Sequence, residues 1–278
     1  MFLSRLTVDV GSDATRERPG RLWLHNLYRV HQRLCMAFPS APRKERDPDF
    51  LAPYKPSDFP EQRHLADKKN TEVEPGVLKH VHSPRNPEAG FLFRIDPGPA
   101  GRAVILVQSA VKPDWDYAFQ NAGFLLAAPA EVKVYEPGFA AGQRLRFRLA
   151  ANPTRKLSQH SRERDGKPVA EKWVGKRVPV PADQLLPWLA EWRVRPDEPP
   201  GFCIDKDSTT VHAGYIYVNK GREEGGQRLR SVRYDGILEV TDADKFRNTL
   251  LRGIGPGKAF GFGLLSVAPY TGPAAAIS

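Results

Sequence analysis

The segment from Leu22 to Phe38 carries the residues of this chain that are best suited to acid–base chemistry. Its apolar residues recur at helical spacing, and on a helix Tyr28, His31 and Cys35 become neighbours beside that apolar stripe. Imidazole titrates near neutral pH, so His31 is a candidate proton donor or acceptor with Tyr28 next to it. A histidine at the edge of a core is also commonly a hydrogen-bonded structural residue, and spacing alone does not decide between these roles.

The chemistry open to such a pair depends on the substrate. In RNA transesterification the 2′-hydroxyl is itself the nucleophile, so a positioned histidine can act without a metal ion or a protein nucleophile. Arg29 and Arg33 are expected on the opposite side of the helix, away from the apolar stripe. His31 and Tyr28 are therefore candidates for acid–base chemistry on RNA that would need no metal site and no cofactor, and the structural role stays open at this point.

Other histidines and the cysteines are weaker candidates. His80 and His82 are two residues apart in a proline-bounded segment, but no further ligands at zinc-like spacing complete a set. Cys35 and Cys203 are the only cysteines, too few for a disulfide framework, and are most simply small apolar residues. This cysteine content fits a reducing environment, so we expect a cytoplasmic protein.

A basic strand and a basic hairpin are predicted in the second half of the chain. The segment Arg144 to Leu149 reads Arg-Leu-Arg-Phe-Arg-Leu, so a strand would present three guanidinium groups on one face and three apolar side chains on the other. Further on, a glycine-rich turn at 220–227 would join two strands into a ribbon able to lie along a nucleic-acid duplex. A charge run is often only a solvated face, but the strict alternation favours binding. The residues assigned to nucleic-acid binding here are Arg144, Arg146, Arg148, Arg155, Lys156, Lys220, Arg222, Arg228, Arg230 and Arg233.

A glycine-rich run from Gly253 to Pro269 is a candidate phosphate-binding loop. Gly255 and Gly257 allow positive φ and close approach of a ligand, with N–H groups free to point at phosphate oxygens, and Lys258 adds a positive charge. We therefore assign these three residues to nucleic-acid binding as well. The run does not fit the Walker A pattern, which argues against nucleotide hydrolysis.

The same run partly matches a motif of RNA-recognition domains. Lys258, Phe260, Gly261 and Phe262 agree with the RNP1 pattern, in which aromatic rings on a strand stack on bases. The alternative is a glycine-rich helix end that leads into a buried strand. Both interpretations stay open on sequence alone.

Composition favours a polyanionic partner. The chain has 42 Lys and Arg against 32 Asp and Glu, a formal net charge of +10 and a pI near 9.7. Such a surface binds nucleic acid through release of condensed counterions. With 278 residues, 40% of them hydrophobic, the chain is long enough for two domains with real cores. No run approaches the roughly 20 apolar residues of a membrane span.

The predicted elements occur in the same order twice. In the first half, strand, helix, strand, strand, short helix and strand are expected at 2–10, 22–38, 90–95, 103–107, 115–123 and 132–135. In the second half, the same order is expected at 143–150, 182–192, 202–218, 228–240, 242–251 and 259–267. This order is typical of the ferredoxin-like fold. We therefore predict an α+β protein with two tandem ferredoxin-like βαββαβ domains, at 1–138 and 139–278, with a proline- and charge-rich insertion at about 40–88.

Four segments together resemble a known family. They are MFLSRLTVDV at 1–10, LYRVHQRLCMAFP at 27–39, RLRFRLAANPTRK at 144–156 and GIGPGKAFGFGLLSVAP at 253–269. In this order they are similar to the CRISPR RNA-processing endoribonucleases of type I-E systems, the CasE subunits of the Cascade surveillance complex. The glycine-rich end and the Tyr-x-x-His helix are together specific, whereas the basic strand alone is not. The 40–88 insertion is longer than the family pattern.

The resemblance implies a fold, an activity and partners. The family has two ferredoxin-like domains and cleaves the repeat of precursor CRISPR RNA just 3′ of a stem-loop, without a metal, leaving a cyclic phosphate. By position in the motif, His31 matches the family's catalytic histidine and Tyr28 its active-site tyrosine. The expected partners are the repeat RNA stem-loop, the mature crRNA and other Cascade subunits, with no membrane. Two alternatives remain: a non-catalytic RNA-binding module that stacks bases on Phe260 and Phe262, and a structural Cascade subunit that only holds the hairpin.

Overall fold

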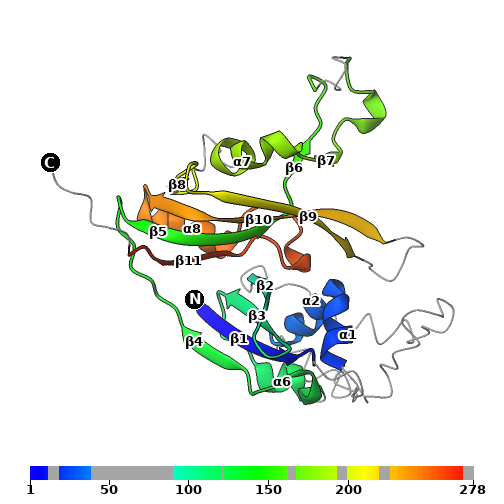
Figure 1. Cartoon of the computed structure of the whole chain (residues 1–278), viewed down its shortest axis with the longest axis vertical. Coiled ribbons are helices and arrows are strands. Elements are labelled where there is room, and N and C mark those ends of the chain that lie inside the picture. The colour runs from blue at the N-terminus through cyan, green and yellow to red at the C-terminus, as the bar shows by residue number, and fades with distance from the viewer. Residues whose placement is uncertain are drawn as a thin grey trace. The chain divides into compact units, whose positions relative to one another are not determined.

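The computed structural model describes residues 1–11, 19–38, 90–120, 122–161, 167–192, 199–218 and 226–271 (Figure 1). The chain divides into two compact units. The first consists of Met1–Pro137 with Val218–Gln227 and Ala259–Gly261, and the second of Gly138–Tyr217, Arg228–Lys258 and Phe262–Ser278. The predicted insertion at 40–88 lies outside the described residues. The division into functional domains at residue 138 stays a prediction.

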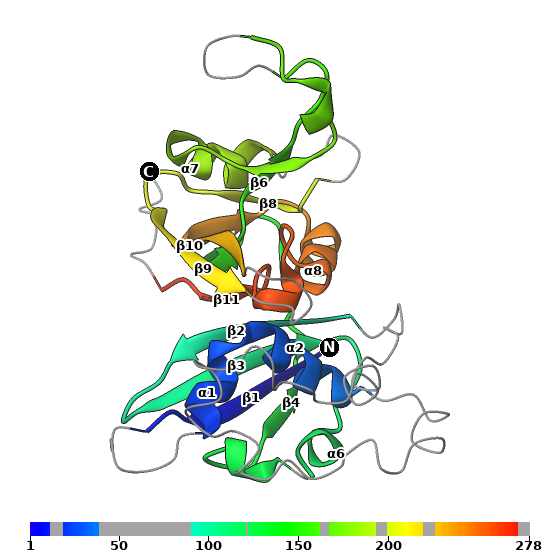
Figure 2. The ribbon, with the colours of Figure 1, turned by 90° about the vertical axis from the view of Figure 1, so that its right-hand side faces the viewer.

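The first unit is built on a four-stranded antiparallel sheet. Its strands are β1 (Phe2–Asp9), β2 (Phe91–Pro97), β3 (Arg102–Ser109) and β4 (Glu131–Val134), in the order β2-β3-β1-β4. Figure 2 shows α1 (Pro19–His25) and α2 (Leu27–Met36) lying across one face of this sheet. A short helix α6 (Trp115–Phe119) and a 3₁₀ turn (Gly123–Leu125) precede β4. This is the ferredoxin-like arrangement.

The helical segment before β2 differs from the expectation of one continuous helix. Asn26 has an extended conformation, and its side chain accepts a hydrogen bond from the Arg29 backbone N–H at 3.2 Å. An asparagine in this position caps the start of a new helix instead of continuing the old one. The segment therefore forms two helices, α1 and α2, and α2 alone carries Tyr28, His31 and Cys35.

The core of the first unit lies between the helices and the sheet. Leu6 of β1, Phe93 of β2 and Ile105 of β3 are completely buried there, together with Val30 and Leu34 of α2. The strand residues alternate between core and opposite face, as the period of a strand requires. The packing fixes α2, and therefore its polar side chains, on the sheet.

The second unit repeats the topology with a larger sheet. Its strands are β5 (Arg144–Ala151), β8 (Phe202–Ile204), β9 (Thr210–Val218), β10 (Gln227–Val240) and β11 (Leu265–Pro269). The sheet order is β11-β5-β10-β8, and β9 also pairs with β10. With α8 (Ala243–Arg252) as its second helix, this unit is ferredoxin-like too, so the predicted fold class is confirmed.

Three elements of the second unit differ from their predicted form. The expected strand at 202–218 is interrupted after β8, where the Asp205 carboxylate accepts hydrogen bonds from the backbone N–H groups of Asp207 and Ser208. The expected helix at 182–192 is a 3₁₀ turn (Ala182–Gln184), one α turn, α7 (Leu185–Pro187), and a π turn (Trp188–Trp192). The last strand begins at Leu265 instead of residue 259, because a 3₁₀ turn (Lys258–Phe260) and glycines with positive φ precede it.

A two-stranded arm also belongs to this unit. β6 (Thr154–Lys156) pairs with β7 (Arg177–Pro179), and a 3₁₀ turn (Glu171–Trp173) lies in their connection.

The core beneath the main sheet includes Leu149 of β5, Tyr234 and Leu238 of β10, and Phe246 of α8. No helix of the described ranges is long and apolar enough to cross a membrane.

Candidate active site and nucleic-acid interface

His31 is held on α2 among aromatic rings. Its side chain is only 7% exposed. The imidazole stacks on Phe91 at 5.5 Å and on Phe93 at 6.4 Å between ring centroids, with interplanar angles of 27° and 17°. The Tyr28 ring lies one helical turn earlier, 6.4 Å from the imidazole. Strand β2 and helix α2 thus fix the plane of the candidate catalytic ring.

The thiol of Cys35 contacts the same imidazole. Its Sγ lies 3.6 Å from His31 Nε2 and 4.0 Å from Nδ1. Spacing at i and i+4 predicted this neighbourhood, and the structure bears out the proximity. An acid–base catalyst must present its reacting nitrogen in a fixed direction, and contacts on several sides of the ring serve that requirement. The catalytic role of His31 and Tyr28 stays a prediction.

Arg33 corrects one sequence expectation. We expected it to point away from the packed side of the helix, but it is only 5% exposed, and its Nη1 donates to the Ala118 carbonyl of α6 at 2.9 Å. The cause is α6, which packs on the side of α2 that periodicity leaves polar. The Arg33 guanidinium therefore stabilises the packing of α6 on α2 by donating to a carbonyl of α6. Its charge does not belong to the solvent-exposed charge of the unit.

The basic strand β5 has the alternation that the sequence predicts. Three arginines are exposed along one face, and three apolar side chains are buried on the other: Arg144, Arg146 and Arg148 against Leu145, Phe147 and Leu149. The exposed row lies on a sheet whose buried face is covered by the helices of the same unit. The strand can therefore present cations to an anionic ligand.

Two carboxylates partly neutralise that row, and sequence reasoning missed both. Asp235 lies directly opposite Arg148 on β10 and pairs with it at 2.5 Å and with Arg233 at 2.8 Å. Asp205 pairs with Arg144 at 3.3 Å. Only the strand register brings Asp235 to Arg148, and no local pattern contains that register.

Arg146 has a different environment. It lies opposite Ile237, and its guanidinium carbon is 6.0 Å from the centroid of the Tyr270 ring. Within the part of the chain that the structure describes, no carboxylate is in ion-pair distance of Arg146. Of the three arginines on β5, Arg146 therefore has the charge that is most available to a phosphate.

Arg228 and Arg230, both assigned to nucleic-acid binding from the sequence, have different environments on the ribbon formed by β9 and β10. Arg228 is exposed, with its guanidinium carbon 3.6 Å from the centroid of the Tyr215 ring. Arg230 is half-buried, and its Nη1 donates to the Val180 carbonyl. Arg230 therefore ties the ribbon to the rest of the unit, whereas Arg228 stays accessible. The predicted contacts Lys220 and Arg222 lie outside the described residues.

The arm carries Arg155 and Lys156 on β6. Lys156 is exposed, and Arg155 is half-buried with an Nε that has no hydrogen-bond partner. Near the base of β7, Lys176 lies with its Nζ 4.5 Å from the centroid of the exposed Trp173 ring. The arm thus adds cations to the same unit as β5 and the ribbon.

The glycines of the loop at 253–263 have a packing role. Gly255 and Gly257 have φ values of 82° and 83°. A Cβ at Gly257 would lie 2.8 Å from Cδ2 of Phe262, and one at Gly255 would lie 3.2 Å from Cη2 of Trp188. Both glycines are thus required by the backbone and by neighbouring rings of the same unit. Their contact with RNA stays a proposal.

The remaining residues of this loop weigh against base stacking. Phe260 is 9% exposed and Phe262 is 3% exposed, and neither lies on a strand. The RNP1-like interpretation needs exposed rings on a sheet, so the structure does not fit it. Lys258 donates from Nζ to the Arg252 carbonyl at the end of α8, where a positive charge is favourable.

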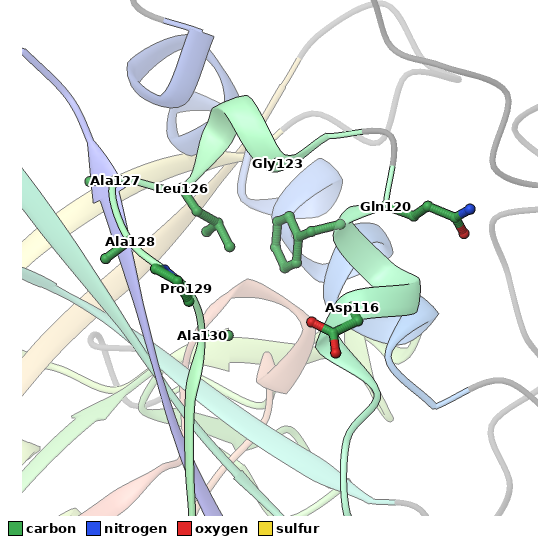
Figure 3. Close-up of a pocket in the computed structure, with 9 residues that line it drawn as sticks. Asp116, Gln120, Gly123, Leu126, Ala127, Ala128, Pro129 and Ala130 are labelled. Carbon is green, nitrogen blue, oxygen red and sulfur yellow. The ribbon is translucent and has the colours of Figure 1, made fainter.

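A cavity of the first unit lies apart from these residues. It opens between α6 and the segment before β4, has a volume of about 590 Å³, and has Asp116, Gln120, Leu126 and Pro129 among its lining residues (Figure 3). Neither Tyr28 nor His31 lines it. Across the described ranges, no three His, Cys, Asp or Glu residues cluster as metal ligands would, and His80 and His82 fall outside those ranges.

Comparison with known proteins identifies the family. The model of the family "CRISPR associated protein" matches residues 73–269. The chain is 36% identical over 189 residues to the CRISPR-associated endoribonuclease Cse3 of Thermus thermophilus, covering 64% of this chain and 80% of that protein. It is 25% identical over 251 residues to the CRISPR system Cascade subunit CasE of Escherichia coli, covering 90% of this chain and 95% of the relative.

A solved structure agrees with these relatives. Thermus thermophilus Cse3, bound to an RNA that represents a pre-cleavage complex, superposes with a TM-score of 0.59 at 27% identity. The match covers 96% of this chain and 98% of that one. The fold, the family model and the relatives all agree, and the chain therefore belongs to the family of CRISPR-associated proteins and is homologous to the Cse3/CasE endoribonucleases of the type I-E Cascade.

Proposed function

We propose that this chain is the endoribonuclease that cleaves the repeat hairpin of precursor CRISPR RNA at the 3′ base of its stem. The relationship to Cse3, whose structure contains an RNA representing a pre-cleavage complex, is the observation that carries this proposal. We also propose that mature crRNA and other Cascade subunits are partners of the protein; the name of the relative, Cascade subunit CasE, supports the assembly with other subunits. The low cysteine content is consistent with activity in the cytoplasm.

The proposed reaction is an internal transesterification. The 2′-oxygen on the nucleotide 5′ of the scissile phosphate forms a bond to phosphorus, and the bond from phosphorus to the 5′-oxygen of the next nucleotide breaks. The products are a 2′,3′-cyclic phosphate and a 5′-hydroxyl. The 2′-hydroxyl loses a proton and the leaving 5′-oxygen gains one. His31 transfers one of these two protons, solvent exchanges the other, and the Tyr28 hydroxyl orients the reacting groups.

Hairpin binding is assigned to the second unit. Its accessible cations include Arg146 on β5, Lys156 on the arm and Arg228 on the ribbon, where no carboxylate of the described residues neutralises them. Arg144, Arg148 and Arg233 contribute less free charge because Asp205 and Asp235 pair with them. Phosphate contacts of this kind position a duplex without reading its sequence.

We expect the purified protein to cleave the labelled repeat RNA of its own CRISPR array, and to do so equally well in excess EDTA. The reason is that the attacking oxygen belongs to the RNA, so no metal-bound water is needed. The measurement is the single-turnover rate with and without chelator. Activity that disappears with EDTA and returns with Mg²⁺ would contradict this mechanism. Binding without any cleavage would instead support the alternative of a structural subunit that only holds the hairpin.

Replacing Arg228 or Arg146 by alanine is expected to weaken hairpin binding and to lower the slope of log K against log salt by about one for each lost phosphate contact. The measurement is the dissociation constant at several salt concentrations. Arg247→Ala is the matched control, because Arg247 lies on α8 and pairs with Asp244 at 2.8 Å. An Arg228→Ala slope equal to that of the control would show that Arg228 contacts no phosphate. Arg230→Ala should lower the thermal midpoint instead, since Arg230 holds the Val180 carbonyl.

A further inference from the structure

Two tyrosines on β9 expose their rings to solvent. Tyr215 is 50% exposed and Tyr217 is 70% exposed, the latter being the largest value for a bulky apolar or aromatic side chain in the described residues. They are two residues apart on one strand, so their side chains project from the same face of the ribbon, about 7 Å apart. Rings this exposed contribute little to the core of the unit.

An exposed arginine accompanies these rings. The guanidinium carbon of Arg228 lies 3.6 Å from the centroid of the Tyr215 ring, and that of Arg230 lies 5.9 Å from it. Arg228 is exposed and has no ion-pair partner among the residues that the structure describes. Strands β9 and β10 are paired neighbours (Figure 1), so the exposed tyrosine rings of β9 and the Arg228 guanidinium of β10 lie close together.

This combination fits an unpaired base better than a duplex. In a regular duplex the faces of the bases are stacked on one another, and a protein reaches only base edges and phosphates. An unpaired base exposes its face, and proteins bind it by stacking on aromatic rings or guanidinium planes beside a cationic path for the backbone. Arg228 alone could bind a phosphate of a duplex. The two exposed tyrosine rings on the same face have no base face to stack on in a regular duplex.

We propose that Tyr215, Tyr217 and Arg228 form a stacking site for an unpaired nucleotide of the bound RNA. The proposal rests on the proposed function, because that function makes RNA the ligand. It goes beyond it by assigning to the ribbon a contact with a base outside the paired stem, in addition to the phosphate contacts of the arginines. The ribbon thereby distinguishes a hairpin with unpaired nucleotides from a fully paired duplex.

The test compares two RNA probes on the full chain: a single-stranded adenosine nonamer and a blunt RNA duplex of twelve base pairs. Tyr215→Ala/Tyr217→Ala is expected to weaken nonamer binding about tenfold and to leave duplex binding within twofold, because only unpaired bases stack on the rings. The matched control is Tyr215→Phe/Tyr217→Phe, which keeps both rings and should bind the nonamer like the wild type. Replacing the nonamer by an abasic nonamer should abolish the difference between the alanine and phenylalanine variants.

Several outcomes would overturn the stacking site. They are nonamer affinity that is unchanged in the alanine variant, equal losses on nonamer and duplex, or equal losses in the alanine and phenylalanine variants. Unchanged RNA binding with lost Cascade assembly would assign the tyrosines to a protein contact instead. Should the double variant fail to fold, Tyr217→Ser alone, at the more exposed position, gives the same comparison. Wild-type cleavage of the repeat hairpin is measured separately, so its absence would refute the proposed function without altering the stacking result.

Discussion

His31→Ala is expected to lower the rate of repeat-RNA cleavage by about 10²–10⁴-fold, the range typical of a general acid or base, and to leave the affinity for the hairpin nearly unchanged. The reason is that His31 lies on α2 of the first unit, whereas the accessible cations assigned to hairpin binding lie on β5, β6 and β10 of the second. The measurements are single-turnover cleavage and the dissociation constant on the same RNA.

The controls for this variant follow from the packing of the imidazole. His31 is almost completely buried against Phe91 and Phe93, so alanine leaves a cavity that lowers stability. His31→Gln fills more of the space without a titrating group, and its thermal midpoint should lie closer to that of the wild type. Tyr28→Phe should cost less activity than either variant if the hydroxyl only orients the reacting groups. If His31→Gln cleaved RNA at the wild-type rate, His31 would not be the acid or base of the reaction, and another residue would have that role.

The second large effect is on the substrate side. A single 2′-deoxy substitution on the nucleotide 5′ of the scissile phosphate should abolish cleavage, because it removes the nucleophile of the proposed reaction. Hairpin binding should stay within a few-fold of the unmodified RNA, since the contacts assigned to Arg146 and Arg228 are made to phosphates and do not use this 2′-hydroxyl.

The matched control carries the deoxy substitution one nucleotide further from the cleavage site and should be cut at the normal rate. Cleavage of the first RNA at a rate close to that of the control would mean that water attacks the phosphate. His31 would then have to act as the base that activates water. A pure binding module would cut neither RNA.

The order of elements and the identity of the exposed strand face follow from the sequence itself. Alternation along Arg144 to Leu149 and helical spacing of Tyr28, His31 and Cys35 are local periodicities, and they depend only on the geometry of a strand or a helix. The element order, which occurs once in each half of the chain, was enough to predict the ferredoxin-like fold. This order leaves few ways to build an antiparallel sheet covered by helices. The four family-like segments then pointed to the activity.

Only the tertiary structure decided which of the charged residues remain available. Asp235 reaches Arg148 through the register of β10 against β5, and α6 buries Arg33, and neither contact has a local signature. The close packing of Gly255 against Trp188 and of Gly257 against Phe262 has no local signature either, and the contact of these glycines with RNA stays a prediction. Periodicity reports which side of an element is apolar, whereas charge neutralisation and close packing depend on residues far apart in the chain. For that reason the sequence predicted the elements of the site, and the packing of strands and helices determined which of its side chains can meet a substrate.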